Sequence, residues 1–319
     1  MNPIQRMAAA LALAAATAFA PALAADQSVA EAALRADAVC TKCHDESDAK
    51  PILAIYQTRH GVKADSRAPT CQSCHGDSDK HVKGDGSGKR AKPDVVFGRT
   101  GVAPREQAAA CLTCHSSGKR NHWSGSVHER EDIACATCHT VHATRDRVLD
   151  RATQPEVCFQ CHKEQRAQVN RISTHPIDAG KVACSDCHNP HGSAGPRLLV
   201  GNTLNETCFN CHAEKRGPFL FDHQPVSDDC STCHTPHGSN NAPLLKARLP
   251  YLCQECHSGD HARSPYSGAN LPGGNLTTIA GTKPFQNQAP NAQIVGKDCL
   301  NCHSLVHGSN SPAGAKFQR

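Results

Sequence analysis

Every cysteine of this chain belongs to one repeated motif, Cys-x-x-Cys-His, and this repetition constrains the fold more than any other feature of the sequence. The motif occurs ten times and accounts for all 20 cysteines. Two thiols at this spacing followed directly by histidine are the sequence signature of covalent c-type haem attachment. The ten motifs are Cys40/Cys43/His44, Cys71/Cys74/His75, Cys111/Cys114/His115, Cys135/Cys138/His139, Cys158/Cys161/His162, Cys184/Cys187/His188, Cys208/Cys211/His212, Cys230/Cys233/His234, Cys253/Cys256/His257 and Cys299/Cys302/His303.

The chemistry of the motif predicts a role for each of its residues. The two thiols add across the vinyl groups of one porphyrin, and the adjoining histidine binds the iron from the proximal side. The sequence therefore predicts ten haem c groups. Zinc sites and disulfides are the alternatives, but zinc needs ligand sets of four that combine these pairs, and neither alternative explains the histidine after every second cysteine. No cysteine remains for a separate disulfide or a nucleophile.

The second axial ligand of each iron is also expected to be a histidine. The chain has 21 histidines, so the ten motifs leave eleven. Methionine, the usual rival ligand, occurs only at Met1 and Met7. We therefore expect bis-histidine ligation at every iron, which gives lower reduction potentials than ligation by histidine and methionine.

The spacing of the remaining histidines selects ten of the eleven. The motifs form five consecutive pairs, and each pair has one histidine upstream of its second motif and one downstream. A histidine three residues after a proximal ligand does not readily reach the opposite face of the same iron, so it is expected to bind a neighbouring haem. His122 is the surplus histidine. The predicted distal ligands, pair by pair, are His60 and His81, His128 and His142, His175 and His191, His223 and His237, and His261 and His307.

The start of the chain is typical of a secretory signal peptide. Arg6 precedes an apolar run over residues 7–20, and the small residues at positions 22–24 predict cleavage after about Ala24. The run is shorter than the ~20 residues that a membrane-spanning helix needs. We expect residues 1–24 to be removed and the mature protein to be exported to the periplasm, where it is soluble or held by a partner.

The composition predicts a thin side-chain core. Aromatic residues make up 4% of the chain and hydrophobic residues 38%, a figure that includes the cysteines and the signal peptide. The porphyrins are therefore expected to supply most of the apolar interior, so that folding depends on haem binding. The net charge of +5 counts no haem propionates, so it does not indicate a nucleic-acid partner.

The sequence predicts an elongated, haem-packed chain of short α-helices and coil with little β structure. The paired motifs recur with a unit of about fifty residues, which is typical of a stack built by duplication. Thr153–Glu156 and Thr203–Glu206 match capping boxes placed just before cysteines. Turns are expected after the second motif of a pair, at Asn189-Pro190 and Thr235-Pro236. Residues 259–298 are expected to form an irregular loop.

Several segments resemble the MtrA/DmsE family of periplasmic decahaem cytochromes. They are His-Ala-Glu-Lys-Arg-Gly-Pro at 212–218, Cys-Ser-Asp-Cys-His-Asn-Pro-His-Gly at 184–192 and the stretch from Cys299 to Asn310, together with the motif spacings. The resemblance covers the mature chain and implies two pentahaem halves, near 25–172 and 173–319. It also implies insertion into an outer-membrane β-barrel porin, with the ten predicted distal histidines as ligands and His122 outside them.

The expected function is electron transfer without catalysis, relaying electrons between the periplasm and the cell exterior. The resemblance implies a periplasmic or inner-membrane cytochrome as donor or acceptor, with an extracellular multihaem cytochrome as a further candidate partner. Flow in either direction stays open, toward metal reduction or from Fe(II) oxidation. Two alternatives also stay open: a multihaem reductase with one open haem, although no Cys-x-x-Cys-Lys motif occurs, and a soluble periplasmic shuttle.

Overall fold

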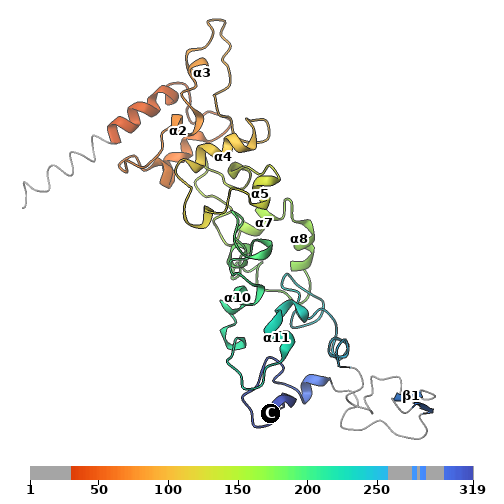
Figure 1. Cartoon of the computed structure of the whole chain (residues 1–319). Coiled ribbons are helices and arrows are strands. Elements are labelled where there is room, and N and C mark those ends of the chain that lie inside the picture. The colour runs from red at the N-terminus through yellow and green to blue at the C-terminus, as the bar shows by residue number, and fades with distance from the viewer. Residues whose placement is uncertain (1–29, 258–274, 279–280, 285–297, 319) are drawn as a thin grey trace, which may run out of the picture. The chain divides into compact units, whose positions relative to one another are not determined.

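The structure is a computed structural model that describes residues 30–257, 275–278, 281–284 and 298–318 (Figure 1). The predicted signal peptide, residues 1–24, and the predicted ligand His261 lie outside the described residues. In the described part of the chain, no helix combines the length and hydrophobicity needed to cross a bilayer.

The chain divides by its internal contacts into two units, Met1–Val157 and Cys158–Arg319. The boundary falls within the short helix α7, Gln154–Cys158. The predicted pentahaem halves, 25–172 and 173–319, stay a prediction.

The first unit consists of short helices joined by coil. A helix over residues 30–41 carries the first motif. The elements that follow are η1 Ile52–Gln57, η2 Arg59–Gly61, α2 Cys71–His75, α3 Asp79–Lys83, α4 Pro104–Leu112, η3 Gly118–Arg120, α5 Val127–Arg130 and α6 Cys135–Cys138.

The second unit is built in the same way and contains one small hairpin. Its helices are α8 Lys163–Val169, α9 Cys184–Cys187, η4 Pro196–Leu198, α10 Leu204–Phe209, η5 Ala213–Lys215, α11 Gln224–Asp228, η6 Cys230–Thr232, α12 Tyr251–Gln254, η8 Cys299–Asn301 and η9 Gly314–Lys316. Strands β1, Asn275–Thr278, and β2, Gly281–Pro284, pair antiparallel, with Asn275 opposite Pro284. The irregular loop expected over 259–298 therefore contains this hairpin, while the expectation of little β structure is confirmed in the described residues.

The predicted start of α10 is confirmed. The Glu206 amide donates to Thr203 Oγ1 at 3.1 Å, and the Thr203 amide donates to Glu206 Oε2 at 3.3 Å. This reciprocal capping box satisfies two N–H groups that a helix leaves free at its start. Helix α7 begins at Gln154, as expected, but the Thr153 hydroxyl donates to the Arg147 carbonyl at 2.7 Å.

The predicted turns after the second motifs are also confirmed. The Gly192 amide donates to Asn189 O at 3.0 Å, and the Gly238 amide donates to Thr235 O at 3.1 Å. Both glycines have positive φ, 105° and 141°. At Gly238 an added Cβ would collide with the Gln168 carbonyl, so the turn requires glycine for close approach as well as for φ.

The apolar core of the described polypeptide is small. Its buried cluster contains Phe159, Val169 and Ile177, with Val182 packed against it. Such a cluster buries little surface for a chain of this length, and burial of apolar area is the main stabilising contribution to folding. The thin core agrees with the composition.

Candidate haem-binding sites

Each Cys-x-x-Cys-His motif forms about one turn of helix. Within the motif, the histidine amide bonds back to the carbonyl of the first cysteine, for example His115 N to Cys111 O at 2.9 Å and His303 N to Cys299 O at 2.8 Å. Residues three apart on a helical turn lie on the same face. The turn therefore presents both thiols on one side and places the histidine directly after them, as attachment to a single porphyrin requires.

The first cysteines of the motifs lie together two by two. In each case the side chains of the first cysteine of an odd motif and of the following even motif are within hydrogen-bonding reach. The pairs are Cys40 with Cys71, Cys111 with Cys135, Cys158 with Cys184, Cys208 with Cys230, and Cys253 with Cys299. This contact gives the five consecutive motif pairs of the sequence a structural meaning.

The second cysteines are less covered by the polypeptide than the first. All ten first cysteines are half-buried. The attachment role predicted for all 20 cysteines stays a prediction. Seven of the second cysteines lie at the surface of the polypeptide, open to a group outside it. They are Cys43, Cys114, Cys161, Cys187, Cys211, Cys256 and Cys302.

Within each unit, one motif pair also lies close to the next. The second cysteine of an even motif is near the second cysteine of the following odd motif. Cys74 lies near Cys114, Cys187 near Cys211, and Cys233 near Cys256. Within a unit, successive motifs are thus neighbours in space as well as in sequence.

The predicted proximal and distal histidines face one another across a constant gap. Seven ring pairs have centres 5.9–6.4 Å apart: His44–His81, His60–His115, His75–His142, His175–His212, His188–His237, His223–His257 and His234–His307. When two imidazoles bind one metal from opposite sides, each nitrogen lies about 2 Å from the metal, so the two nitrogens are about 4 Å apart. Each ring centre lies about 1 Å beyond its nitrogen, which gives about 6 Å between the two ring centres. The gap therefore suits one metal between two rings.

The pairing follows a rule that interlocks the motif pairs. A downstream histidine faces the second-motif histidine of the preceding pair, as His237 faces His188 and His307 faces His234. An upstream histidine faces the first-motif histidine of the following pair. His60 faces His115 and His223 faces His257 in this way.

The first motif pair has no preceding pair, so the rule for downstream histidines does not apply to it. His81, the downstream histidine of the first pair, instead faces His44 of the same pair. The expectation that a closely following histidine serves a neighbouring motif therefore agrees with the geometry at His142, His237 and His307.

Five further predicted ligands lie in or next to short helices. His128 lies in α5, His139 follows α6, His162 precedes α8, His191 lies in the turn after α9 and His303 follows η8. The surplus histidine, His122, is exposed between η3 and α5.

The Nδ1 atom of nine predicted ligand histidines is held by a carbonyl oxygen. The acceptors are Val95 O for His75, Ala91 O for His81, Ile52 O for His142, Pro236 O for His175, Arg197 O for His188, Val306 O for His223, Pro243 O for His234, Gln168 Oε1 for His237 and Lys316 O for His303, at 2.6–3.1 Å. A hydrogen bond of this kind fixes the tautomer with Nε2 unprotonated and orients the ring, as is usual for metal-binding histidine.

Two motif histidines use a carboxylate instead. His44 Nδ1 lies 3.1 Å from Asp48 Oδ2, and His139 Nδ1 lies 2.7 Å from Asp146 Oδ2. A carboxylate acceptor makes the opposite ring nitrogen more basic. These acceptors lie at irregular distances along the chain, which is why sequence patterns did not indicate them.

The environment of several rings favours the neutral imidazole that a metal needs. Burial is the main cause that lowers the pKa of His75, His234, His237 and His307. Burial disfavours the charged form of a base. These rings therefore stay neutral at physiological pH.

The zinc and disulfide alternatives find no support in the described residues. In that part of the chain, no three or more His, Cys, Asp or Glu side chains converge in an arrangement that could hold a metal ion directly. The cysteines, all of which lie in described segments, form no disulfide. The thiols instead lie on single helical turns and the imidazoles in facing pairs. These residues fit haem c.

Comparison with known proteins agrees with this chemistry. Two family models match, "Doubled CXXCH motif" at residues 175–217 and 223–262, and "Cytochrome c-type protein NrfB-like" at residues 71–154. The multiheme cytochrome MtrA of Shewanella baltica is 43% identical over 286 residues, which cover 88% of this chain and 80% of that protein. The chain belongs to the MtrA family of multihaem cytochromes. It is therefore an electron-transfer protein and not an enzyme, and it binds haem c.

A second relative matches over a shorter region. The cytochrome c-type protein NrfB of Haemophilus influenzae is 30% identical over 149 residues, which cover 40% of this chain and 65% of that protein. The likeness to MtrA extends over most of both proteins, so it bears on the whole arrangement of motifs.

Proposed function

We propose that this protein carries ten haem c groups and relays electrons between the periplasm and the cell exterior inside an outer-membrane β-barrel porin. The interlocked imidazole pairs are the observation that carries the proposal. Each downstream or upstream histidine that faces another motif pair ties two neighbouring sites together through a short stretch of backbone. Closely spaced redox groups of this kind suit conduction.

The ligand set proposed for the irons is the one predicted from the sequence. The ten motif histidines bind from the proximal side, and His60, His81, His128, His142, His175, His191, His223, His237, His261 and His307 bind from the distal side. The constant ring separation and the Nδ1 acceptors support this assignment. Two imidazoles on an iron leave no position for a substrate, so the chain's residues hold and insulate the redox groups.

The proposed location follows from the signal peptide predicted over residues 1–24 and from the likeness to MtrA. The mature chain enters the porin from the periplasm. On one side it exchanges electrons with a periplasmic or inner-membrane cytochrome, and on the other with an extracellular acceptor, donor or multihaem cytochrome. The potentials of these partners set the direction of flow, toward metal reduction or from Fe(II) oxidation.

Reconstitution tests the proposal. The full mature protein and a candidate outer-membrane β-barrel porin are placed in sealed proteoliposomes that enclose a redox dye, and reductant is added outside. Electron transfer to the dye that requires both proteins supports conduction. Transfer to a soluble partner without the barrel supports the periplasmic shuttle instead. Binding of carbon monoxide to the reduced protein at neutral pH supports an open haem, as a reductase needs.

A further inference from the structure

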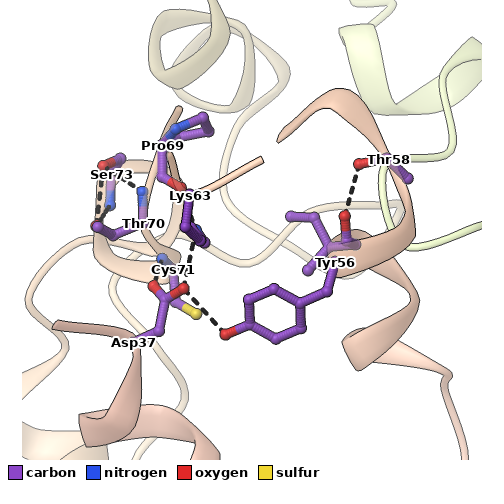
Figure 2. Close-up of polar contacts among 9 residues, drawn as sticks. Asp37, Tyr56, Thr58, Lys63, Pro69, Thr70, Cys71 and Ser73 are labelled. Atoms are coloured by element: carbon purple, nitrogen blue, oxygen red, sulfur yellow. Dashed lines mark hydrogen bonds and ion pairs between the residues drawn. The ribbon is translucent and has the colours of Figure 1, made fainter. Parts of the chain in front are cut away.

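A buried carboxylate joins the first two motifs. Asp37 precedes Cys40 by three residues on the helix over 30–41, so both lie on one helical face. Asp37 is 1% exposed. The Cys71 amide donates to Asp37 Oδ1 at 2.9 Å. Because Cys71 begins α2, Asp37 satisfies an N–H at the start of the helix that carries the second motif (Figure 2).

The same connection recurs in the second unit without a charge. Asn205 precedes Cys208 by three residues on α10 and is 8% exposed. The Cys230 amide donates to Asn205 Oδ1 at 2.8 Å. The Asn205 Nδ2 group donates to Val226 O at 3.0 Å and to Ser227 O at 3.1 Å. A neutral amide therefore suffices to hold two motifs together.

The corresponding position in the other three pairs has no hydrogen-bonding side chain. It is Ala108 before Cys111, Pro155 before Cys158 and Pro250 before Cys253. All three positions are buried. The polar connection is thus a feature of the first and fourth motif pairs, and only the first uses a charged group.

The second oxygen of Asp37 belongs to a buried ion pair. Asp37 Oδ2 lies 2.8 Å from Lys63 Nζ and accepts a hydrogen bond from the Tyr56 hydroxyl at 2.9 Å. Lys63 is 9% exposed, donates to Pro69 O at 2.7 Å, and has its ammonium 5.5 Å from the Tyr56 ring centre (Figure 2). Burying two charges costs desolvation energy that a neutral amide avoids. Holding the two motifs together does not explain the desolvation cost of the ion pair, because Asn205 makes the same hydrogen bond without a charge.

The carboxylate is ionised where it lies. Burial raises the pKa of Asp37, but hydrogen bonds from Lys63, the Cys71 amide and Tyr56 outweigh it, so the pKa is lowered overall. A buried charge is weakly screened and acts over several ångströms. Reduction of an iron removes one positive charge, so a fixed negative charge nearby favours the oxidised form and a fixed positive charge favours the reduced form.

We propose that the buried Asp37–Lys63 pair is an electrostatic control element for the haem pair held by Cys40 and Cys71, whereas Asn205 is its neutral counterpart at Cys208 and Cys230. Asp37 is a positioning residue that also holds down the potential of this pair, and Lys63 opposes it. The inference rests on the proposed haems at these two motifs. It concerns their potentials and not the passage of electrons through a porin.

Single substitutions in the full mature protein separate charge from structure. Asp37→Asn keeps an oxygen for the Cys71 amide, as Asn205 does for Cys230, and removes the negative charge. Lys63→Gln removes the positive charge. Tyr56→Phe is the matched control, because it removes a hydrogen bond to the same Asp37 oxygen without changing any charge. Lys63→Arg is the conservative variant that retains the charge.

The test is a spectropotentiometric titration at neutral pH, after mass spectrometry of the haem peptides has counted the haems. We expect Asp37→Asn to shift a minor fraction of the absorbance to higher potential and Lys63→Gln to shift the same fraction to lower potential. Tyr56→Phe and Lys63→Arg are expected to titrate as the wild type does. Opposite signs support an electrostatic role, because a loss of structure moves both variants alike.

Three results overturn the inference: an unshifted Asp37→Asn titration, shifts of equal sign in Asp37→Asn and Lys63→Gln, or a Tyr56→Phe shift as large as that of Asp37→Asn. Loss of haem from Asp37→Asn also overturns it, because the amide is then not equivalent to the carboxylate. Absence of haem from these motifs in the wild type counts against the proposed function instead, and the peptide masses report it separately.

Discussion

His237 faces His188 with 6.1 Å between the ring centres, although the two histidines belong to different motif pairs. His237 follows the eighth motif, and His188 ends the sixth. The Nδ1 atom of His237 is held by Gln168 Oε1 at 3.1 Å, and Gln168 lies on α8, before both motifs. One imidazole thus depends on three separated segments, so the sites are expected to form together rather than one by one.

The His237–His188 relationship predicts the effect of changing the distal ligand. We expect His237→Met to retain all covalent haems, because no motif residue changes, and to raise the potential of the haem held by Cys184 and Cys187, since methionine ligation gives higher potentials than histidine. Redox titration with near-infrared magnetic circular dichroism, which detects methionine ligation, measures this. His122→Met is the control, because His122 is exposed. A methionine signal in the control, or none in His237→Met, contradicts the assignment.

The buried imidazoles predict how the protein responds to acid. A base whose pKa is lowered in the folded state destabilises that state as pH falls below the ordinary value, about 6.5 for histidine. His75, His234, His237 and His307 have pKa values lowered mainly by burial. We expect the low-spin spectrum to persist down to about pH 6.5 and to be lost only at lower pH. A high-spin band that already grows at alkaline pH contradicts this expectation.

Asn205 provides a stability prediction in the second unit. Asn205→Ala leaves the amide of Cys230 and the carbonyls of Val226 and Ser227 without the partners they have in the structure. Leaving buried polar groups unsatisfied costs about 1–3 kcal/mol. Denaturant unfolding of the haem-loaded protein, followed by far-ultraviolet circular dichroism, measures the loss. Asn202→Ala is the control, because Asn202 is exposed. Equal unfolding midpoints for the two variants count against the role of Asn205.

The local elements could be predicted because their signals are local. The capping box at Thr203, the turn at Thr235-Pro236 and the single helical turn at each motif follow from residues at most a few positions apart. Predicting which histidine rings pair requires more than the spacing of the sequence. Spacing selected candidate ligands and excluded His122, but the faces that meet depend on contacts such as His142 Nδ1 to Ile52 O, 90 residues away.

Some features carried no usable sequence signal. Asp37 resembles any helix aspartate, and its partners Tyr56, Lys63 and Cys71 follow at no fixed interval. The hairpin β1–β2 lies in a stretch rich in Gly, Asn, Pro and Thr, whose composition is typical of loops. In both places the structure depends on contacts between residues that no short pattern identifies.

Gly238 offers a test of the link between backbone geometry and the ligand beside it. Its φ of 141° is unfavourable for any other residue, and a Cβ there would collide with Gln168 O. Because of this collision, we expect Gly238→Ala to lower the unfolding free energy by about 1–3 kcal/mol more than a control that has only positive φ. Gly314→Ala is that control, since its φ is 72° and an added Cβ would lie 3.8 Å from Phe221.

The same variant has a spectroscopic consequence, because moving residue 238 also moves the adjacent His237 away from the Gln168 side chain that orients it. We expect a partial high-spin signal in Gly238→Ala and none in Gly314→Ala, measured by electron paramagnetic resonance of the oxidised proteins. Destabilisation without any change of spin state contradicts this link, because it places the strain in the turn and leaves the imidazole where it was.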